Sequence, residues 1–368
     1  MARDAAPLVE EAARALESGD PGRALEAAER ALARDRRSVA ALHYRAAALA
    51  DLGRLDEARE AYEDALGRGG EDVDLLLGAA DFLLRRAGEE PARGDAEAAR
   101  ELARRAGRIA RARAEGTGVP EAAGVGEADV DPDAEAAGEA ALLEGQALLQ
   151  LGDAPEALAR LDEARGALPG DLDVRLERGA ALFELCRFEE AAAEYREVLA
   201  AAPDEPAAHH GLGLALERLG DARRAEGHLA RARALAPDDY AAPVEIPPDE
   251  FERIVETALG GLPEPVRRYL SNVAIAVEDL PATEELVASD PPLSPGILGI
   301  FRGAPLPHKA SMDPWSHFPS SIGLFQRNLE RYARDRDELV EEIRVTLLHE
   351  VGHFLGLDED ELYRRGLD

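Results

Sequence analysis

Two histidines and a glutamate near the C-terminal end of the sequence have the spacing of a metal site on a helix. His349 and His353 are four residues apart, so a helix places both imidazoles on one face, within reach of a single Zn²⁺. Glu350 follows the first histidine, where a glutamate can take a proton from metal-bound water. The pattern predicts a zinc site with a general base. An amphipathic helix with two solvated histidines is the alternative interpretation.

A third metal ligand is expected just beyond this helix. Gly356 can adopt a positive φ and end the helix, and Glu359 then completes the string H-E-x-x-H-x-x-G-x-x-E. Two neutral imidazoles leave the charge of the metal uncompensated, so one anionic ligand is favourable. We predict that His349, His353 and Glu359 bind one Zn²⁺ per chain, with Asp358 as the alternative third ligand.

The ends of the helix and its apolar residues are also visible in the sequence. Carboxylates at Asp335, Asp337 and Glu338 favour a helix start because they lie near the positive end of the helix dipole. An apolar residue then recurs every four residues, which predicts that one side of the helix is buried. These residues are Leu339, Ile343, Leu347, Val351 and Leu355.

The C-terminal stretch, about residues 246–368, resembles the small bacterial zincin-like metallopeptidases, single domains of little more than a hundred residues. The matching pieces are 248–253, 271–279, 297–303, 322–325 and the H-E-x-x-H helix. The resemblance implies a zinc ion, a catalytic Glu350, the ligands His349 and His353, and an acidic third ligand. In that family the third ligand is usually an aspartate, at the position of Glu359. The implied substrate is a peptide or protein.

We expect this stretch to be a small α+β domain. A helix is predicted at about 249–259, and apolar runs predict strands at 273–277, 299–301 and 322–325, the last directly before the active-site helix. In zincins a strand near the cleft pairs with the extended substrate, and 321–326 is the candidate for that edge, with an interior strand as the alternative.

The oxyanion donor is not assigned by the sequence. The loop from Pro305 to Ser320 contains His308, Lys309, Trp315 and His317. It covers the cleft, supplies an oxyanion donor, or is a surface loop with a packed tryptophan, and we favour the surface loop. Tyr363 is another candidate donor.

A period of 34 residues runs through the first two thirds of the sequence. Glycine, alanine and proline each recur at this interval: Gly145, Gly179 and Gly213; Ala157, Ala191 and Ala225; Pro169, Pro203 and Pro237. This pattern resembles the tetratricopeptide repeat, in which small residues let two helices pack closely. The resemblance implies an all-α superhelix whose concave surface binds a peptide or partner protein.

We count six repeats in two groups. Three lie within residues 5–113, and three within 138–239. The intervening segment, 114–137, is rich in Gly, Ala, Glu, Asp and Pro and is predicted to be a flexible linker that divides the superhelix into two blocks. The repeats and the C-terminal domain have separate apolar periodicities, so we expect them to fold separately and to be coupled in function.

The composition narrows the range of partners and locations. Lys and Arg number 43 and Asp and Glu 75, so the formal net charge is −32, which argues against nucleic acid and anionic membranes as partners. A single cysteine, Cys186, permits no disulfide within the chain. With no apolar signal core at the N-terminus, a cytoplasmic protein is expected.

Three functions fit these observations. The first is a zinc metallopeptidase to which the repeats recruit a substrate or partner. The second is a non-enzymatic interaction scaffold whose zincin-like module is vestigial or only binds metal. The third is a metallohydrolase that acts on something other than peptides.

Overall fold

The chain folds into two compact units, which are described separately here. The computed structural model describes residues 5–89, 93–117, 131–306 and 320–364. The first unit contains residues 1–182 and 190–201, and the second contains residues 183–189 and 202–368. Within the described residues, no helix is both long and apolar enough to cross a lipid bilayer.

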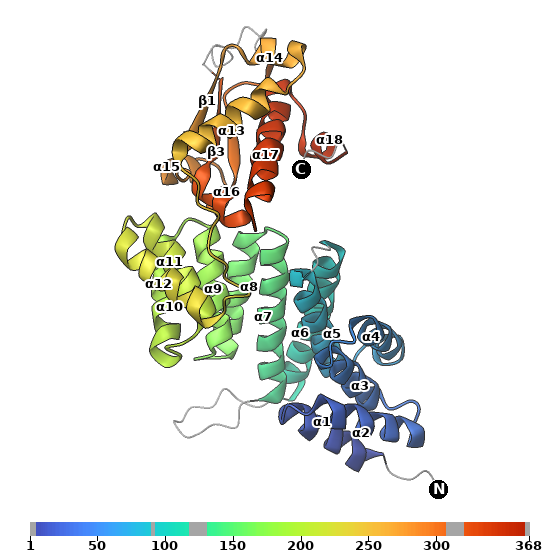
Figure 1. Cartoon of the computed structure of the whole chain (residues 1–368). Helices are drawn as coiled ribbons and strands as arrows, with labels where there is room; N and C mark the ends of the chain where they lie inside the picture. The colour runs from blue at the N-terminus through green and yellow to red at the C-terminus, as the bar shows by residue number, and fades with distance from the viewer. Residues whose placement is uncertain (1–4, 90–92, 118–130, 307–319, 365–368) are drawn as a thin grey trace. The chain divides into compact units, whose positions relative to one another are not determined.

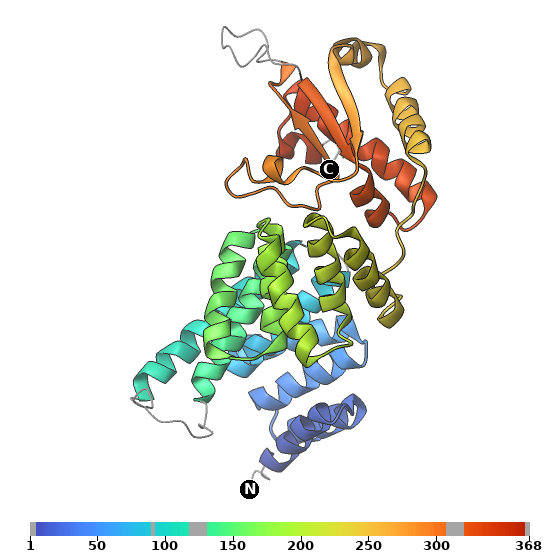
Figure 2. The ribbon, with the colours of Figure 1, turned by 90° about the vertical axis from the view of Figure 1, so that its left-hand side faces the viewer.

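Residues up to 235 form the helices of the repeats (Figures 1 and 2). These are α1 (Ala6–Glu17), α2 (Pro21–Arg34), α3 (Val39–Asp51), α4 (Leu55–Gly69), α5 (Val73–Glu89), α6 (Arg93–Thr117), α7 (Pro132–Gln150), α8 (Ala154–Ala167), α9 (Leu172–Glu184), α10 (Phe188–Ala201), α11 (Pro206–Arg218) and α12 (Ala222–Leu235).

The 34-residue period corresponds to close packing between the two helices of a pair. A Cβ atom added to Gly179 of α9 would lie 2.7 Å from the ring of Tyr195 on α10, so only glycine fits there. The same contact recurs one period earlier and one period later, between Gly145 and Leu161 and between Gly213 and Leu229. The repeating glycine therefore marks the point where the second helix presses a large side chain onto the first.

In the described residues, the two expected blocks of repeats are in contact with each other. Helix α6 extends to Thr117 and α7 begins at Pro132, so both ends of the predicted linker are helical, and residues 118–130 lie outside the described chain. Ala106 of α6 and Ala140 of α7 lie in one apolar cluster, and Ala99 and Ala147 share another. The predicted division is therefore wrong, because the apolar faces of α6 and α7 pack together whatever segment joins them.

The C-terminal domain consists of short helices around a three-stranded sheet (Figure 1). Its elements are α13 (Pro248–Gly260), α14 (Glu264–Leu270), β1 (Val273–Glu278), α15 (Thr283–Leu286), β2 (Gly299–Arg302), β3 (Ser320–Phe325), α16 (Gln326–Tyr332), α17 (Arg336–Leu355) and α18 (Glu359–Arg364). Apolar residues from α13, β1, β3, α16 and α17 form its core.

Strand β3 lies in the centre of this sheet. It pairs in parallel with β1 and antiparallel with β2, giving the strand order β1-β3-β2. The prediction that 321–326 forms an edge for substrate is therefore wrong. Both neighbouring positions are taken by strands, and five of the six residues of β3 are buried. In addition, α16 separates β3 from α17, which the sequence did not indicate.

An arginine ties the two outer strands together. Arg302 on β2 donates to Glu278 on β1 at 2.8 Å and to Glu285 at 2.7 Å. Its guanidinium passes over Gly323 of the central strand, where an added Cβ would lie 2.6 Å from Arg302 Nη1. Glycine at this position therefore allows the ion pair to cross the sheet.

Candidate metal centre

Helix α17 presents the predicted metal ligands, and its ends are those expected from the sequence. Asp335 caps its first turn by accepting hydrogen bonds from the backbone N–H groups of Asp337 and Glu338, both at 2.9 Å. Gly356 ends the helix with φ 91°, in the left-handed region. The predicted apolar residues face the core: Leu339, Ile343, Leu347 and Val351 are buried, and Leu355 is partly buried.

The two imidazoles converge on one point. His349 Nε2 and His353 Nε2 are 3.0 Å apart, and the rings meet nearly edge to face. Two nitrogens that each lie about 2.0–2.1 Å from one tetrahedral zinc ion are about 3.3 Å apart, so the observed separation fits a shared ion closely. Both rings are half-buried. These two donors therefore fit a zinc ion by chemistry and by spacing.

A backbone carbonyl orients the second imidazole. His353 Nδ1 lies 3.3 Å from the carbonyl oxygen of Leu357, just past the end of the helix. A proton on Nδ1 shared with this carbonyl leaves Nε2 free of hydrogen and available to a metal, which is the usual arrangement of a metal-binding histidine. The turn at Gly356 thus ends the helix and also brings this carbonyl to the ring.

Glu350 lies between the histidines in sequence and is packed against the sheet. Its side chain is 6% exposed. An added Cβ on Gly299, the first residue of β2, would lie 3.1 Å from Glu350 Cγ and 2.7 Å from Thr346 Cγ2. Glycine at position 299 therefore permits the close approach of β2 to α17. The sequence analysis did not identify Gly299, because a single glycine in a strand carries no signal for the helix that it contacts.

The alternative third ligand, Asp358, has a different role in this structure. Its Oδ1 accepts a hydrogen bond of 2.8 Å from the backbone N–H of Glu361, which caps the first turn of α18, and the residue is exposed. Glu359 begins α18, but its side chain lies outside the described residues. Where the structure describes side chains, no group of three or more His, Cys, Asp and Glu is close enough to hold a metal.

Glycine within the H-E-x-x-H string positions α18. A Cβ added to Gly352 would lie only 2.3 Å from Leu362 Cδ2, and Leu362 is completely buried. The chain also returns over the end of α17, since the N–H of Leu357 bonds to the carbonyl of Gly352 at 3.0 Å. The helix that begins with Glu359 is therefore fixed against the helix that carries both histidines.

Two further predictions concern oxyanion donors. Tyr363 is 72% exposed, and its role as a donor stays a prediction. His308, Lys309, Trp315 and His317 all lie in 307–319, outside the described residues.

An array of helical repeats followed by a small mixed-sheet domain with an H-E-x-x-H helix defines a repeat protein that carries a metallopeptidase-type domain. The comparison with family models specifies both parts. Residues 270–367 match the zincin-like metallopeptidase family. Residues 9–73 and 148–212 each match a tetratricopeptide repeat model. The chain therefore contains tetratricopeptide repeats and, at 270–367, a zincin-like metallopeptidase domain.

Solved structures that resemble the chain include tetratricopeptide repeat proteins. PilF of Pseudomonas aeruginosa is 15% identical, with 64% of this chain and 92% of that chain covered and a TM-score of 0.49. PilW, a type IV pilus biogenesis factor, is 16% identical, covering 64% and 94%, with a TM-score of 0.49. YrrB, a repeat protein with an unusual peptide-binding site, is 18% identical, covering 58% and 94%, with a TM-score of 0.39. The comparison with curated proteins gives no match.

Proposed function

We propose that the C-terminal domain is a zinc-dependent peptidase and that the repeats bring it a substrate or a partner protein. One observation carries this proposal: His349 Nε2 and His353 Nε2 converge to 3.0 Å on the helix that also holds the buried Glu350. A site that only binds zinc for structural reasons does not need a glutamate at this position. This feature favours the enzyme over a non-enzymatic scaffold.

His349, His353 and Glu359 are the proposed zinc ligands. Bound zinc supplies Lewis-acid stabilisation of the negative charge that develops on a reacting carbonyl. Glu350 takes a proton on its carboxylate from the attacking water and delivers it to the nitrogen of the leaving amine. Glu350 is 6% exposed, and its Cγ packs close to Gly299 of β2, so the side chain lies between the helix and the sheet.

The substrate edge of the sheet is proposed to be β2, in place of β3. Strand β2 forms one edge of the described sheet, and its first residue lies against Glu350. An extended peptide that added to this edge would lie alongside the proposed general base, and main-chain hydrogen bonds would orient its scissile bond.

The repeats are proposed to bind a peptide or protein, as stacked helical repeats commonly do. We also propose a cytoplasmic location, supported by the single cysteine of the chain, which cell fractionation can test.

The decisive experiment is metal analysis of the purified protein together with an activity screen on unstructured peptides. We expect one zinc per wild-type chain, no stoichiometric zinc in His353→Ala, and full zinc but no hydrolysis in Glu350→Gln. His228→Ala is a matched control, since His228 Nδ1 also lies 2.9 Å from an imidazole nitrogen, that of His209, but outside the proposed site. Full zinc in His353→Ala would refute the metal site. Zinc-loaded wild-type protein without any hydrolysis of peptides would favour the scaffold.

A further inference from the structure

The segment that joins the last repeat to the C-terminal domain is bound along its length. Residues 241–247, called here the connector, have no helix or strand, and Tyr240 precedes them. The ring of Tyr240 packs on that of His210 of α11, with centroids 4.7 Å apart. In the middle of the connector, the N–H of Val244 bonds to the carbonyl of Glu330 on α16 at 2.9 Å.

Buried polar side chains on α16 complete the attachment of the connector. Glu330 Oε1 accepts a hydrogen bond of 3.1 Å from the N–H of Ile246, and Gln326 Nε2 donates to the carbonyl of Ile246 at 2.9 Å. Gln326 and Glu330 are each 7% exposed, and they bond to each other at 2.7 Å. Buried polar groups on α16 thus take part of their hydrogen bonds from the connector.

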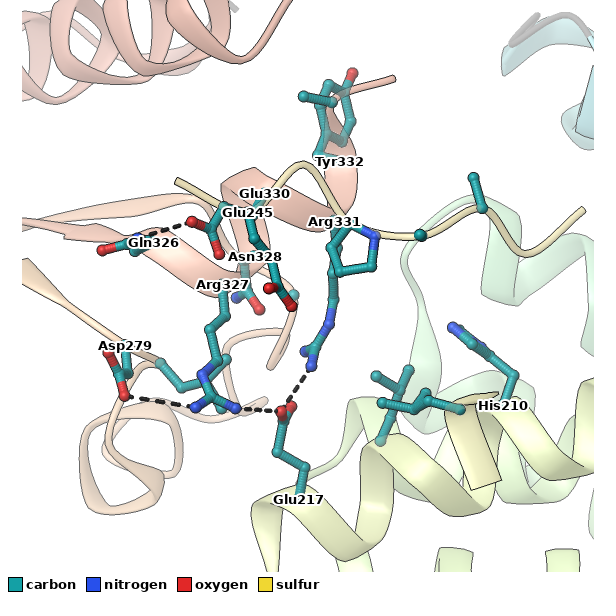
Figure 3. Close-up of a pocket in the computed structure, with 18 of the residues that line it drawn as sticks. His210, Glu217, Glu245, Asp279, Gln326, Arg327, Asn328, Glu330, Arg331 and Tyr332 are labelled. Atoms are coloured by element: carbon teal, nitrogen blue, oxygen red, sulfur yellow. Dashed lines mark hydrogen bonds and ion pairs between the residues drawn. The ribbon is translucent and has the colours of Figure 1, made fainter. Parts of the chain in front are cut away.

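A second attachment joins α11 directly to α16 (Figure 3). Glu217 of α11 accepts from Arg331 at 2.6 Å and from Arg327 at 2.8 Å. The side chain of Glu217 is only 9% exposed. Burial raises the pKa of this carboxyl, but the hydrogen bonds and charges of Arg331 and Arg327 outweigh it and hold the pKa below its ordinary value. The adjacent Arg218 donates to the carbonyl of Pro281 at 2.6 Å.

These contacts share one face of α11. His210, Leu214 and Glu217 follow each other at helical spacing, and all three line the same cavity of about 950 Å³. The opposite wall of the cavity comes from the connector and from α16. Helix α16 is itself anchored in the core of the domain through Leu329, which is completely buried. Every contact described here lies within the second compact unit.

We propose that this face of α11 is a docking surface for the chain's own connector and α16, so that the last repeat is a fixed part of the metallopeptidase-like domain. A partner peptide that used this face would have to displace Tyr240 from His210. External partners of the repeats are therefore expected on helices before α11. The proposal goes beyond the proposed function, since it requires neither zinc nor catalysis.

Hydrogen–deuterium exchange of the full chain tests the docking surface. In Glu217→Gln, the charge of the shared acceptor is lost, so amides of α16 and of the second half of α11 are expected to exchange about tenfold faster or more. The matched control is Asp204→Asn, which removes an exposed ion pair of 2.6 Å with Arg231 without touching the domain. This control should leave exchange in α16 unchanged.

Two further variants separate docking from general loss of stability. Glu217→Arg should increase exchange in α16 more than Glu217→Gln does, and adding Arg331→Glu should restore part of the protection, since a charge pair is re-formed. Tyr240→Ala should accelerate exchange in the connector and in the first half of α11. The proposal would be overturned if Glu217→Gln accelerated exchange in α11 but not in α16. It would also be overturned if adding Arg331→Glu to Glu217→Arg restored no protection in α16.

Discussion

At the scale of single residues, the described part of the chain contains two close imidazole pairs with different chemistry. In the pair His209–His228, the two Nδ1 atoms are 2.9 Å apart, and His209 Nε2 lies 3.0 Å from the carbonyl oxygen of Pro203. With its proton on Nε2, His209 donates a hydrogen bond to that carbonyl. Its Nδ1 then accepts a hydrogen bond from a proton on His228 Nδ1. This pair joins α11 to α12, and its imidazoles bond to each other and to the Pro203 carbonyl. The pair His349–His353 instead comes from one helix and has a glutamate beside it.

The identity of the third zinc ligand can be tested by comparing two adjacent carboxylates. Glu359→Gln should weaken zinc binding by more than the roughly 10–100-fold that is typical of changes outside the ligand set. Asp358→Asn is the control, because asparagine also caps a helix and should preserve α18. Competition with a chromogenic chelator measures both affinities. A larger loss in Asp358→Asn than in Glu359→Gln would assign the ligand to Asp358.

A second residue-scale prediction concerns pH and His210. Burial first, and then the charges of Arg331 on α16 and Arg233 on α12, lower the pKa of His210 from 6.5 to about 4, while the Tyr240 ring covers it. The unfolded chain therefore binds a proton that the folded chain rejects, and stability falls as the pH drops from about 6.5 toward 4. The resulting loss between pH 7 and pH 5 is about 2 kcal/mol.

Replacing His210 by phenylalanine keeps a ring against Tyr240 but removes the titration. The free energy of unfolding of His210→Phe should fall about 2 kcal/mol less between pH 7 and pH 5 than that of the wild type. Denaturant melts at the two pH values measure this difference. Equal pH dependence of the two proteins would show that His210 is not held neutral.

At the scale of elements, the structure shows how α18 is held against α17. Gly352→Ala would force the buried Leu362 to move, at a cost of about 1–3 kcal/mol in the stability of the domain. Zinc affinity should fall as well, since α18 begins with the proposed ligand Glu359. Gly260→Ala is a matched control, because a Cβ there meets no atom within 4 Å.

The double variant Gly352→Ala, Leu362→Ala tests whether a collision with Leu362 causes the loss of stability. Removing the end of the leucine side chain makes room for the new methyl group, so the two substitutions together should cost less than the sum of their separate costs. Thermal melts and chelator competition on all four proteins measure the coupling. Strict additivity would show that the methyl group and Leu362 do not collide.

Sequence reasoning succeeded for α17 because its ends are specified by local chemistry. Asp335 and Gly356 act on backbone groups within a few residues, so both ends of the helix are readable without tertiary structure. The predicted edge position of 321–326 was wrong because strand order depends on pairing between segments that are distant in sequence. One signal was available: residues 322–325 are all apolar or glycine, as in a strand that is buried on both faces.

The docking residue Glu217 was not predictable in the same way. A carboxylate on a helix is most often solvated, and the two partners of Glu217 lie more than a hundred residues further along the chain. Nothing near Glu217 in sequence distinguishes it from the many other acidic residues of this chain.

At the scale of the whole molecule, the boundary between repeats and metallopeptidase-like domain can be placed in two ways. The change of sequence pattern places it near residue 246, whereas the second compact unit of the structure contains residues 202–368 and the short segment 183–189. A fragment of residues 244–368 keeps the core around α17 but lacks Glu217, so Arg327 and Arg331 lose their shared acceptor. A fragment of residues 202–368 retains it.

We expect both fragments to fold and to bind zinc, with the longer fragment melting at least about 4 °C higher. Glu217→Gln in the longer fragment should remove most of this difference, whereas Asp204→Asn should not. Scanning calorimetry with and without zinc provides the measurement. Equal melting temperatures of the two fragments would place the boundary near residue 246 and show that the last repeat adds no stability.

The central position of β3 has a consequence for the order of events during synthesis. In the described sheet, β1 and β2 each pair with β3 alone, so neither can complete these hydrogen bonds until residues 320–325 have left the ribosome. The repeats contact mainly their neighbours in sequence and can form earlier. A nascent chain therefore displays two unsatisfied strand edges beside finished helices for part of its translation, and unpaired strand edges are prone to aggregation.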